Sequence, residues 1–237
     1  MVSLKWLGNS GFIIMSPGGK TIIIDPLIAD NPLSPVKLGD IAIADIVLVT
    51  HDHDDHVGDA ADIVKKTSAT LIAGPDTASR LKSQMGVPPD KVIFGGHGMN
   101  IGESAELKGI TITMTEAFHS SGTDCPAGYI VKLENGVIIY HAGDTGIFES
   151  MRFLAEQYSI DIALIPIGSL FPMDQYRMDP VKASNALKLL KPKKVIPMHY
   201  SFEADASLLS RFVELANKEA PRAKIIVVEP GQEYVLE

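Results

Sequence analysis

Short apolar and β-branched runs, each bounded by Gly, Pro or Asp, recur along the chain and limit what it can fold into. Examples are KTIIID (20–25), ADIVLVT (44–50) and DIALIPIG (161–168). Runs of this length and composition are typical of strands. Because several of them are apolar at almost every position, neither face can lie in water, and the pattern predicts sheets that are covered on both faces.

Helical patterns lie between the later runs, whereas the early runs follow one another closely. Apolar periodicity predicts helices over residues 59–66, 77–84, 148–157, 180–190 and 205–216. Between two of the apolar runs, Asn135-Gly136 predicts a tight hairpin turn. Hairpins followed by crossover helices favour an α/β fold in which helices cover the outer faces of the sheets.

The length and composition predict one globular domain, 1–237. A chain of 237 residues, 46% of them hydrophobic and 21% charged, can bury one large core. The formal net charge of −8 argues against nucleic acid or an anionic membrane surface as a partner.

The sequence favours a cytoplasmic protein. No run approaches the roughly 18 apolar residues of a membrane span, and polar residues interrupt the first segment where a signal peptide would be apolar. The lone Cys125 cannot form an intrachain disulfide and is interpreted as a packing residue.

The segment THDHDDH (50–56) concentrates three of the seven histidines of the chain directly after an apolar run. Ligand sites gather at such strand ends in α/β folds. His51 and His53, two residues apart in an extended chain, project to the same side and can bind one ion. Asp55 and His56 follow where the chain turns, and can bind a second ion beside the first. Alternatively, Asp55 caps the following helix, because Asp is favoured at that position.

Two long irregular stretches, 26–40 and 168–180, are expected to frame a pocket, since such loops more often carry function than shape a core. Lys37 and Arg177 could receive an anionic group such as phosphate. The apolar walls of the pocket would be Phe171, Met173 and Tyr176. The loops therefore favour a small-molecule substrate, which could be phosphorylated. A mobile lid or a contact between copies of the chain in a homo-oligomer is the alternative.

The order of these motifs resembles the metallo-β-lactamase superfamily, whose signature H-x-H-x-D-H stands here at residues 51–56. Other motifs appear in that superfamily's order, namely IIIDP with Asp25, AFHSSG with His119, YHAGDTG with Asp144 and VIPMHYS with His199. Within the superfamily, LGNSGF, HAGDTG and MDPVKASNALKLLKPKKVIPMHY are similar to the metal-dependent hydrolases related to ascorbate-6-phosphate lactonase. Relatives in that branch often carry His at the position of Asn9.

The resemblance implies a four-layer αβ/βα sandwich of two mixed sheets flanked by helices, with the metals at one edge between the sheets. One metal site would contain His51, His53 and His119. The other would contain Asp55, His56 and His199, with Asp144 bridging the two sites. Asp25 is interpreted as an acceptor that holds one histidine tautomer. His141 is grouped with Asp55 and Asp144 as a candidate catalytic residue, but it could orient a ligand, act as a general acid, or be a buried structural histidine.

Imidazole and carboxylate ligands suit two divalent metal ions per chain, with zinc as the first candidate and manganese, iron or nickel as alternatives. Two such ions can share a hydroxide that acts as the nucleophile, and can polarise the attacked oxygen. We therefore expect a metal-dependent hydrolase that cleaves a lactone, an ester or a phosphodiester. Redox or oxygen-handling chemistry is an alternative, although the neutral His53 stands where diiron members of the superfamily usually carry Glu. RNA processing and a metal-stabilised binding protein without turnover also stay open.

Overall fold

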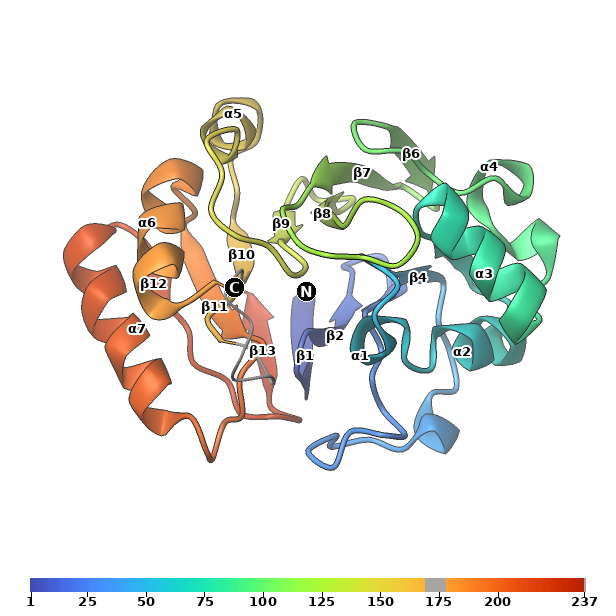
Figure 1. The fold of residues 1–237 in the computed structure, drawn as a ribbon, viewed down its shortest axis with the longest axis horizontal. Helices are drawn as coiled ribbons and strands as arrows, with labels where there is room; N and C mark the ends of the chain where they lie inside the picture. Colours follow the sequence, from blue (N-terminus) through green and yellow to red (C-terminus); the bar gives the residue numbers. More distant parts are fainter. Residues whose placement is uncertain (169–177, 237) are drawn as a thin grey trace.

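The computed structural model describes residues 1–168 and 178–236, and these form a six-stranded and a seven-stranded β-sheet (Figure 1). The first sheet contains, in spatial order, β13 (Glu233–Leu236), β1 (Val2–Gly8), β2 (Gly11–Met15), β3 (Thr21–Ile24), β4 (Ile46–Leu48) and β5 (Thr70–Ile72). The second contains, in spatial order, β12 (Lys224–Ile225), β11 (Lys194–Met198), β10 (Ile162–Pro166), β9 (Ile138–His141), β8 (Ala127–Lys132), β7 (Ile110–Glu116) and β6 (Ser104–Leu107).

The helices lie outside the paired sheets. They are α1 (Asp54–Val57), α2 (Ala60–Thr67), α3 (Pro75–Met85), α4 (Ile93–Gly96), α5 (Met151–Gln157), α6 (Pro180–Leu190) and α7 (Ala206–Glu219), with 3-10 turns η1 (Leu38–Asp40) and η2 (Pro89–Lys91). Figure 1 shows α6 and α7 on one side of the two sheets and α2 and α3 on the other. This arrangement confirms the predicted α/β sandwich of two mixed sheets flanked by helices. Across the described ranges, no helix combines the length and the apolar character needed to span a membrane.

Each sheet is antiparallel at one end and parallel at the other. In the first sheet, β1 to β3 pair antiparallel and β3 to β5 pair parallel. In the second, β6 to β9 pair antiparallel and β9 to β12 pair parallel. The predicted turn at Asn135-Gly136 joins β8 to β9, and Gly136 has a φ of +84° there. Hairpins therefore come first in each half and crossovers follow, as the order of the apolar runs predicted.

The two faces of the first sheet contact different cores, which explains why its inner strands are apolar throughout. In β3, Ile22 and Ile24 belong to the core that joins both sheets, whereas Ile23 belongs to the core beneath α2 and α3. In β4, Ile46 and Val47 divide in the same way. Because successive side chains of a strand point to opposite faces, a strand covered on both faces has to be apolar at every position.

The helix boundaries follow the sequence prediction to within a few residues, and α6 has the predicted bounds. The earlier start of α3 at Pro75 has a long-range cause. In its first turn, the backbone N of Thr77 donates to Asp124 Oδ2 at 2.7 Å, and Asp124 comes from a loop that follows β7. An acceptor at a helix N-terminus stabilises the first turn, and periodicity alone cannot reveal one supplied from elsewhere in the chain.

Candidate metal centre

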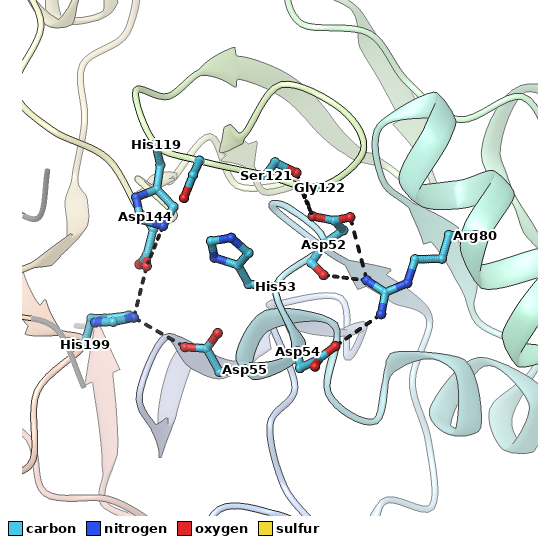
Figure 2. A pocket seen from close by; sticks show the side chains of 11 residues that line it. Asp52, His53, Asp54, Asp55, Arg80, His119, Ser121, Gly122, Asp144 and His199 are labelled. Carbon is cyan, nitrogen blue, oxygen red and sulfur yellow. Dashed lines mark hydrogen bonds and ion pairs between the residues drawn. The ribbon is translucent and has the colours of Figure 1, made fainter. Parts of the chain in front are cut away.

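The segments rich in His and Asp converge where strands of both sheets end (Figure 2). Residues 51–56 follow β4 and lead into α1, while His119, Asp144 and His199 follow β7, β9 and β11. All seven predicted ligands belong to groups whose donor atoms lie within 4.8 Å of one another. Parallel strands of one sheet end at the same edge, so the topology itself brings these loops together.

The first group contains His51, His53 and His119. Nε2 of His51 lies 2.9 Å from Nδ1 of His53. The ring of His119 stands edge-on to both of these rings, with centroid separations of 5.2 and 5.1 Å. His51 is buried, whereas His53 and His119 line the pocket. Three imidazoles in this arrangement form a ligand set typical of zinc sites.

The second group contains Asp55, His56 and His199. Oδ2 of Asp55 lies 3.6 Å from Nε2 of His56 and 3.6 Å from Nε2 of His199. The two imidazole rings are stacked with their centroids 5.6 Å apart. Asp55 lies inside α1, whose N-cap is His53. The alternative interpretation of Asp55 as a helix cap is therefore wrong.

Asp144 lies between the two groups. Its Oδ2 is 3.6 Å from Nε2 of His119 in the first group and 3.1 Å from Nε2 of His199 in the second. The preceding Gly143 has a φ of +61°, and a Cβ at that position would lie 2.5 Å from the carbonyl oxygen of Ala127. Only glycine fits this turn without strain. One carboxylate thus faces histidines of both groups.

Some polar atoms of this cluster are buried without the hydrogen bonds that buried groups normally make. In the part of the chain that the structure describes, Nε2 of His56 and Oδ1 of Asp144 have no hydrogen-bond partner. They belong to a set of five imidazoles and two carboxylates, which is a donor set that zinc and other divalent transition metals prefer. The residues therefore fit divalent metal ions.

Asp25 lies behind His56 and determines which ring nitrogen faces the cluster. Its Oδ2 accepts from Nδ1 of His56 at 2.8 Å and from Oγ1 of Thr50 at 2.7 Å, and its Oδ1 accepts from the Thr50 backbone N at 2.9 Å. The side chains of Asp25 and His56 are both fully buried. An ionised carboxylate can only accept, so Nδ1 carries the proton and Nε2 stays available to a metal. This is the acceptor role that the sequence predicted for Asp25.

Asn9 contacts one predicted ligand carboxylate and the backbone of another predicted ligand. Its Nδ2 donates to Oδ2 of Asp55 at 3.1 Å, and its backbone oxygen accepts from the backbone N of His199 at 2.9 Å. Asn9, Asp25 and His199 have φ values of 50°, 44° and 59°. Each non-glycine residue with such a φ costs roughly 1–3 kcal/mol, and strain of this kind concentrates at functional sites. The sequence flagged Asn9 only as a departure from related chains.

His141 is fully buried and is absent from the lining of the pocket in the described ranges. Its buried ring has Nε2 2.9 Å from the carbonyl oxygen of Ser10, and its Nδ1 accepts from the backbone N of Gly143 at 3.1 Å. Burial also lowers the pKa of His141 below its ordinary value. Because both ring nitrogens are occupied by backbone groups, this geometry contradicts the general-acid interpretation. It favours a structural role in which His141 holds the turn that presents Asp144.

The charges of the cluster are strongly coupled. Burial raises the pKa of Asp144, but His199 and His56 outweigh this effect and hold the pKa well below its ordinary value. Burial lowers the pKa of His199, yet Asp144 and Asp55 raise it to about 9. Burial also lowers the pKa of His56, and Asp144 and Asp25 raise it well above its usual range. Burial and the charge of His56 lower the pKa of His51, so this ring is neutral and ready to bind a cation.

These pKa shifts predict that metal affinity rises with pH. In protein stripped of metal, His199 carries a proton up to a pH of about 9, and a cation has to displace this proton and that of His56. Zinc affinity should therefore increase from pH 6 to pH 9, with release of about two protons per chain at pH 7. Calorimetry in buffers of different ionisation enthalpy measures this release, and a value near zero would contradict the assigned charges.

The same pKa shifts predict that the stability of the stripped protein falls as the pH rises, whereas its metal affinity increases. A histidine whose pKa is raised on folding contributes stability that is fully present below its unfolded pKa of about 6.5 and is lost as the pH rises through the folded value. For His199 the folded value is about 9. The contribution of His199 to the free energy of unfolding is thus expected to fall between these two pH values, which chemical denaturation across that range would measure.

The cluster opens into a pocket of about 830 Å³ (Figure 2). Besides members of the cluster, its lining consists of Asp52, Asp54, Arg80, Ser120, Ser121 and Gly122. Arg80, on α3, is the one arginine or lysine among the described lining residues. Sequence analysis missed Arg80 because no motif surrounds it and because α3 is distant in sequence from most of the predicted ligands.

The loops predicted to frame the pocket do not do so where they are described. No described residue of 26–40 lines it, and Lys37 is an exposed residue. Asp59 holds this loop instead, since its Oδ2 accepts from the backbone N of Ile28 at 2.8 Å. Four other predicted pocket residues lie outside the described residues, namely Phe171, Met173, Tyr176 and Arg177. Cys125 is exposed, so its interpretation as a packing residue is wrong.

Comparison with known proteins shows which family the chain belongs to. Residues 20–200 match the family model described as a β-lactamase superfamily domain. A UPF0173 metal-dependent hydrolase from Nitratidesulfovibrio vulgaris (strain DP4) is 42% identical over 235 residues, which cover 99% of this chain and 95% of that protein. A second UPF0173 metal-dependent hydrolase, from Saccharolobus solfataricus, is 40% identical over 100% of both chains.

A solved structure extends the likeness to three dimensions. Igni18, described as a novel metallo hydrolase from the hyperthermophilic archaeon Ignicoccus hospitalis, has a TM-score of 0.83 at 36% identity, covering 100% of this chain and 99% of its own. None of the proteins compared above is described as a lactonase, so the narrower resemblance is without support from them. The chain belongs to the UPF0173 family of metal-dependent hydrolases within the β-lactamase superfamily.

Proposed function

We propose that the protein hydrolyses an ester, lactone or phosphodiester bond of a small molecule with the help of two divalent cations. The observation that carries this proposal is the position of Asp144, whose Oδ2 lies within 3.6 Å of Nε2 of His119 and within 3.1 Å of Nε2 of His199. A carboxylate shared between two histidine groups is suited to bridging two cations. His51, His53 and His119 would hold one cation, and Asp55, His56 and His199 the other.

The chemistry divides between the cations and the chain. When bound, two divalent cations lower the pKa of a water molecule toward neutrality and polarise the attacked oxygen. Asp144 and Asp55 stay ionised at neutral pH, because His199 and His56 hold the pKa of each carboxyl below its ordinary value despite burial. Asp25 keeps Nδ1 of His56 protonated and so leaves Nε2 as the donor. The nitrogen-rich donor set makes zinc the first candidate, ahead of iron, nickel and manganese.

The pocket favours a small molecule over a polymer. Its volume of about 830 Å³ falls in the range of roughly 300–1,000 Å³ that is typical of small-molecule sites. The described lining contains several carboxylates and a single arginine or lysine, Arg80, whereas a nucleic-acid backbone would be met by several such residues. RNA processing is therefore the weaker alternative. A phosphorylated lactone is the narrower candidate, and it rests on sequence resemblance alone.

Metal analysis combined with a hydrolysis panel tests the proposal. Protein purified without chelators is expected to contain about two equivalents of metal per chain. After removal of metal and separate reconstitution with zinc, manganese, iron(II) or nickel, at least one loaded form should cleave a nitrophenyl ester, a lactone or a bis-nitrophenyl phosphate, and a chelator should abolish this activity.

Three outcomes would contradict the proposal. A metal content of one equivalent per chain or fewer would contradict the proposed pair of cations. Full loading without turnover on the whole panel would indicate a metal-stabilised binding protein. Oxygen consumption by the iron-loaded form, without hydrolysis, would indicate redox chemistry.

The control for the panel is protein that has been denatured by heat and then reloaded with metal. It is needed because protein surfaces hydrolyse nitrophenyl esters slowly without a specific active site.

A further inference from the structure

The loop that carries His119 is joined to the ligand segment by a side chain that is not itself a predicted ligand. Asp52 stands between two of the predicted histidine ligands and is only 6% exposed. Its Oδ1 accepts from Oγ of Ser121 at 2.7 Å and from the backbone N of Gly122 at 2.7 Å (Figure 2). Two hydrogen bonds to a charged acceptor therefore connect residues 51–56 to the loop 119–124.

Arg80 holds Asp52 from the side of α3. Its Nη1 donates to the backbone oxygen of Asp52 at 2.6 Å and lies 3.7 Å from Oδ2 of the same residue. Its Nη2 also donates to Oδ1 of Asp54 at 3.1 Å, but the side chain of Asp54 is 93% exposed. Exposed ion pairs contribute little because solvent screens them. The contact of Arg80 that orients the site is therefore the one with Asp52.

The far end of the same loop is also attached to α3. Oδ2 of Asp124 accepts from the backbone N of Thr77 at 2.7 Å, and Oγ1 of Thr123 lies 2.9 Å from Oγ1 of Thr77. Helix α3 thus supports the loop directly through Thr77 and indirectly through Arg80 and Asp52. Of the side chains that hold the loop, Asp52 is the one that belongs to the segment carrying the other ligands.

We propose that Asp52 is a positioning residue for His119, and that it sets the metal affinity of the group formed by His51, His53 and His119. The inference rests on the proposed two-cation function. In this group His119 alone comes from outside residues 51–56. Thr145 and Gly146 hold the backbone of Phe118 just before it, and Asp52 holds the part of the loop that follows it against that segment. A loop that is ordered only on metal binding loses conformational entropy at that step, which weakens binding. Asp52 removes this loss by ordering the loop beforehand.

The second group provides an internal reference. Asp55 and His56 lie in α1, and the backbone of His199 is held by Asn9, so none of the three depends on the loop 119–124. A change at Asp52 should therefore weaken one metal equivalent and spare the other. A general loss of folding would weaken both.

Four variants separate the contributions. Asp52→Asn keeps an oxygen that can accept from Ser121 and Gly122 but removes the charge, whereas Asp52→Ala removes both. Ser121→Ala removes one of the two hydrogen bonds to Oδ1 and leaves Asp52 intact. Asp54→Asn is the matched control, since it removes the same charge two residues along from an exposed side chain that also contacts Arg80.

Stepwise zinc titration against a chromophoric chelator and hydrogen exchange at the Gly122 amide measure the effects. Asp52→Ala should lower the affinity for one zinc equivalent by roughly tenfold or more, within the range known for changes behind metal ligands, and leave the other nearly unchanged. Asp52→Asn should lower the affinity for the same zinc equivalent less than Asp52→Ala does. The Gly122 amide should exchange faster in Asp52→Ala, and Asp54→Asn should behave as the original chain in both measurements.

Equal weakening of both equivalents, or titrations and exchange rates that do not change in Asp52→Ala, would overturn the inference. If Asp52→Ala does not fold, Ser121→Ala decides, because it should still accelerate Gly122 exchange and weaken the same equivalent. An original chain that binds only one zinc would overturn the proposed function instead. In that case slow exchange at Gly122, accelerated by Asp52→Ala, would still support the role of Asp52 in holding the loop.

Discussion

Replacing Asp144 by alanine is expected to lower the metal content of the purified chain to about one equivalent or fewer and to abolish hydrolysis. The carboxylate faces His119, His56 and His199 at 3.6, 3.4 and 3.1 Å, so its removal leaves imidazoles of both groups without their shared anion. Metal ions contribute several kcal/mol to the stabilisation of such transition states, and a factor of ten in rate corresponds to about 1.4 kcal/mol. A fall in turnover of at least about 1,000-fold is therefore expected.

Elemental analysis and steady-state kinetics on the same preparation check this expectation. Asp54→Ala is the matched control, because Asp54 lines the same pocket with its side chain 93% exposed. It should keep the metal content of the original chain. Near-original stoichiometry in Asp144→Ala would show that Asp144 does not bridge, even if activity were lost.

Replacing Asp25 should damage both stability and metal binding, because one carboxylate satisfies three buried donors. In Asp25→Ala, the backbone N and Oγ1 of Thr50 and Nδ1 of His56 lose their acceptor inside the protein. Breaking a buried, charge-assisted contact of this kind costs about 3–5 kcal/mol. For a chain of this length, that loss corresponds to a decrease in Tm of roughly 6–20 °C.

Asp25→Asn separates the two effects. The amide is close in shape to the carboxylate and can still accept at one oxygen, so the loss of stability should be smaller, about 1–3 kcal/mol. If its nitrogen faces Nδ1 of His56, two donors meet, and the histidine is driven toward the tautomer that cannot present an unprotonated Nε2. Zinc affinity should fall by roughly 10–100-fold.

Calorimetric unfolding and zinc titration measure the two quantities, and Asp59→Asn provides the control. Oδ2 of Asp59 also accepts from two backbone N–H groups, those of Ile28 and Ala29, at 2.8 and 2.9 Å, but it contacts no predicted ligand. Asp59→Asn should lower stability without lowering zinc affinity. Unchanged zinc affinity in Asp25→Asn would show that the tautomer of His56 does not depend on Asp25.

Much of the fold and one part of the site could be predicted from local patterns in the sequence. The bounds of α6 follow from apolar periodicity, and the uniformly apolar β3 and β4 indicate a sheet covered on both faces. His51 and His53 could be paired from their spacing, because a separation of two residues in extended chain places both rings on one side. For His119, Asp144 and His199, no local period exists, and only the resemblance to a known superfamily linked them to the histidine segment.

The sequence by itself determined the elements, their order and the residue types available for a metal centre, because backbone geometry imposes short periods that can be recognised within a few residues. Apart from Asp25, which the family resemblance indicated, only the tertiary structure decided which side chains stand behind those ligands. The contacts of Asp52 with the His119 loop, of Asn9 with Asp55 and of His141 with Ser10 join segments distant in the chain. Such contacts depend on how two sheets and their loops pack together. The spacing of residues along the chain does not reveal which distant segments will lie side by side.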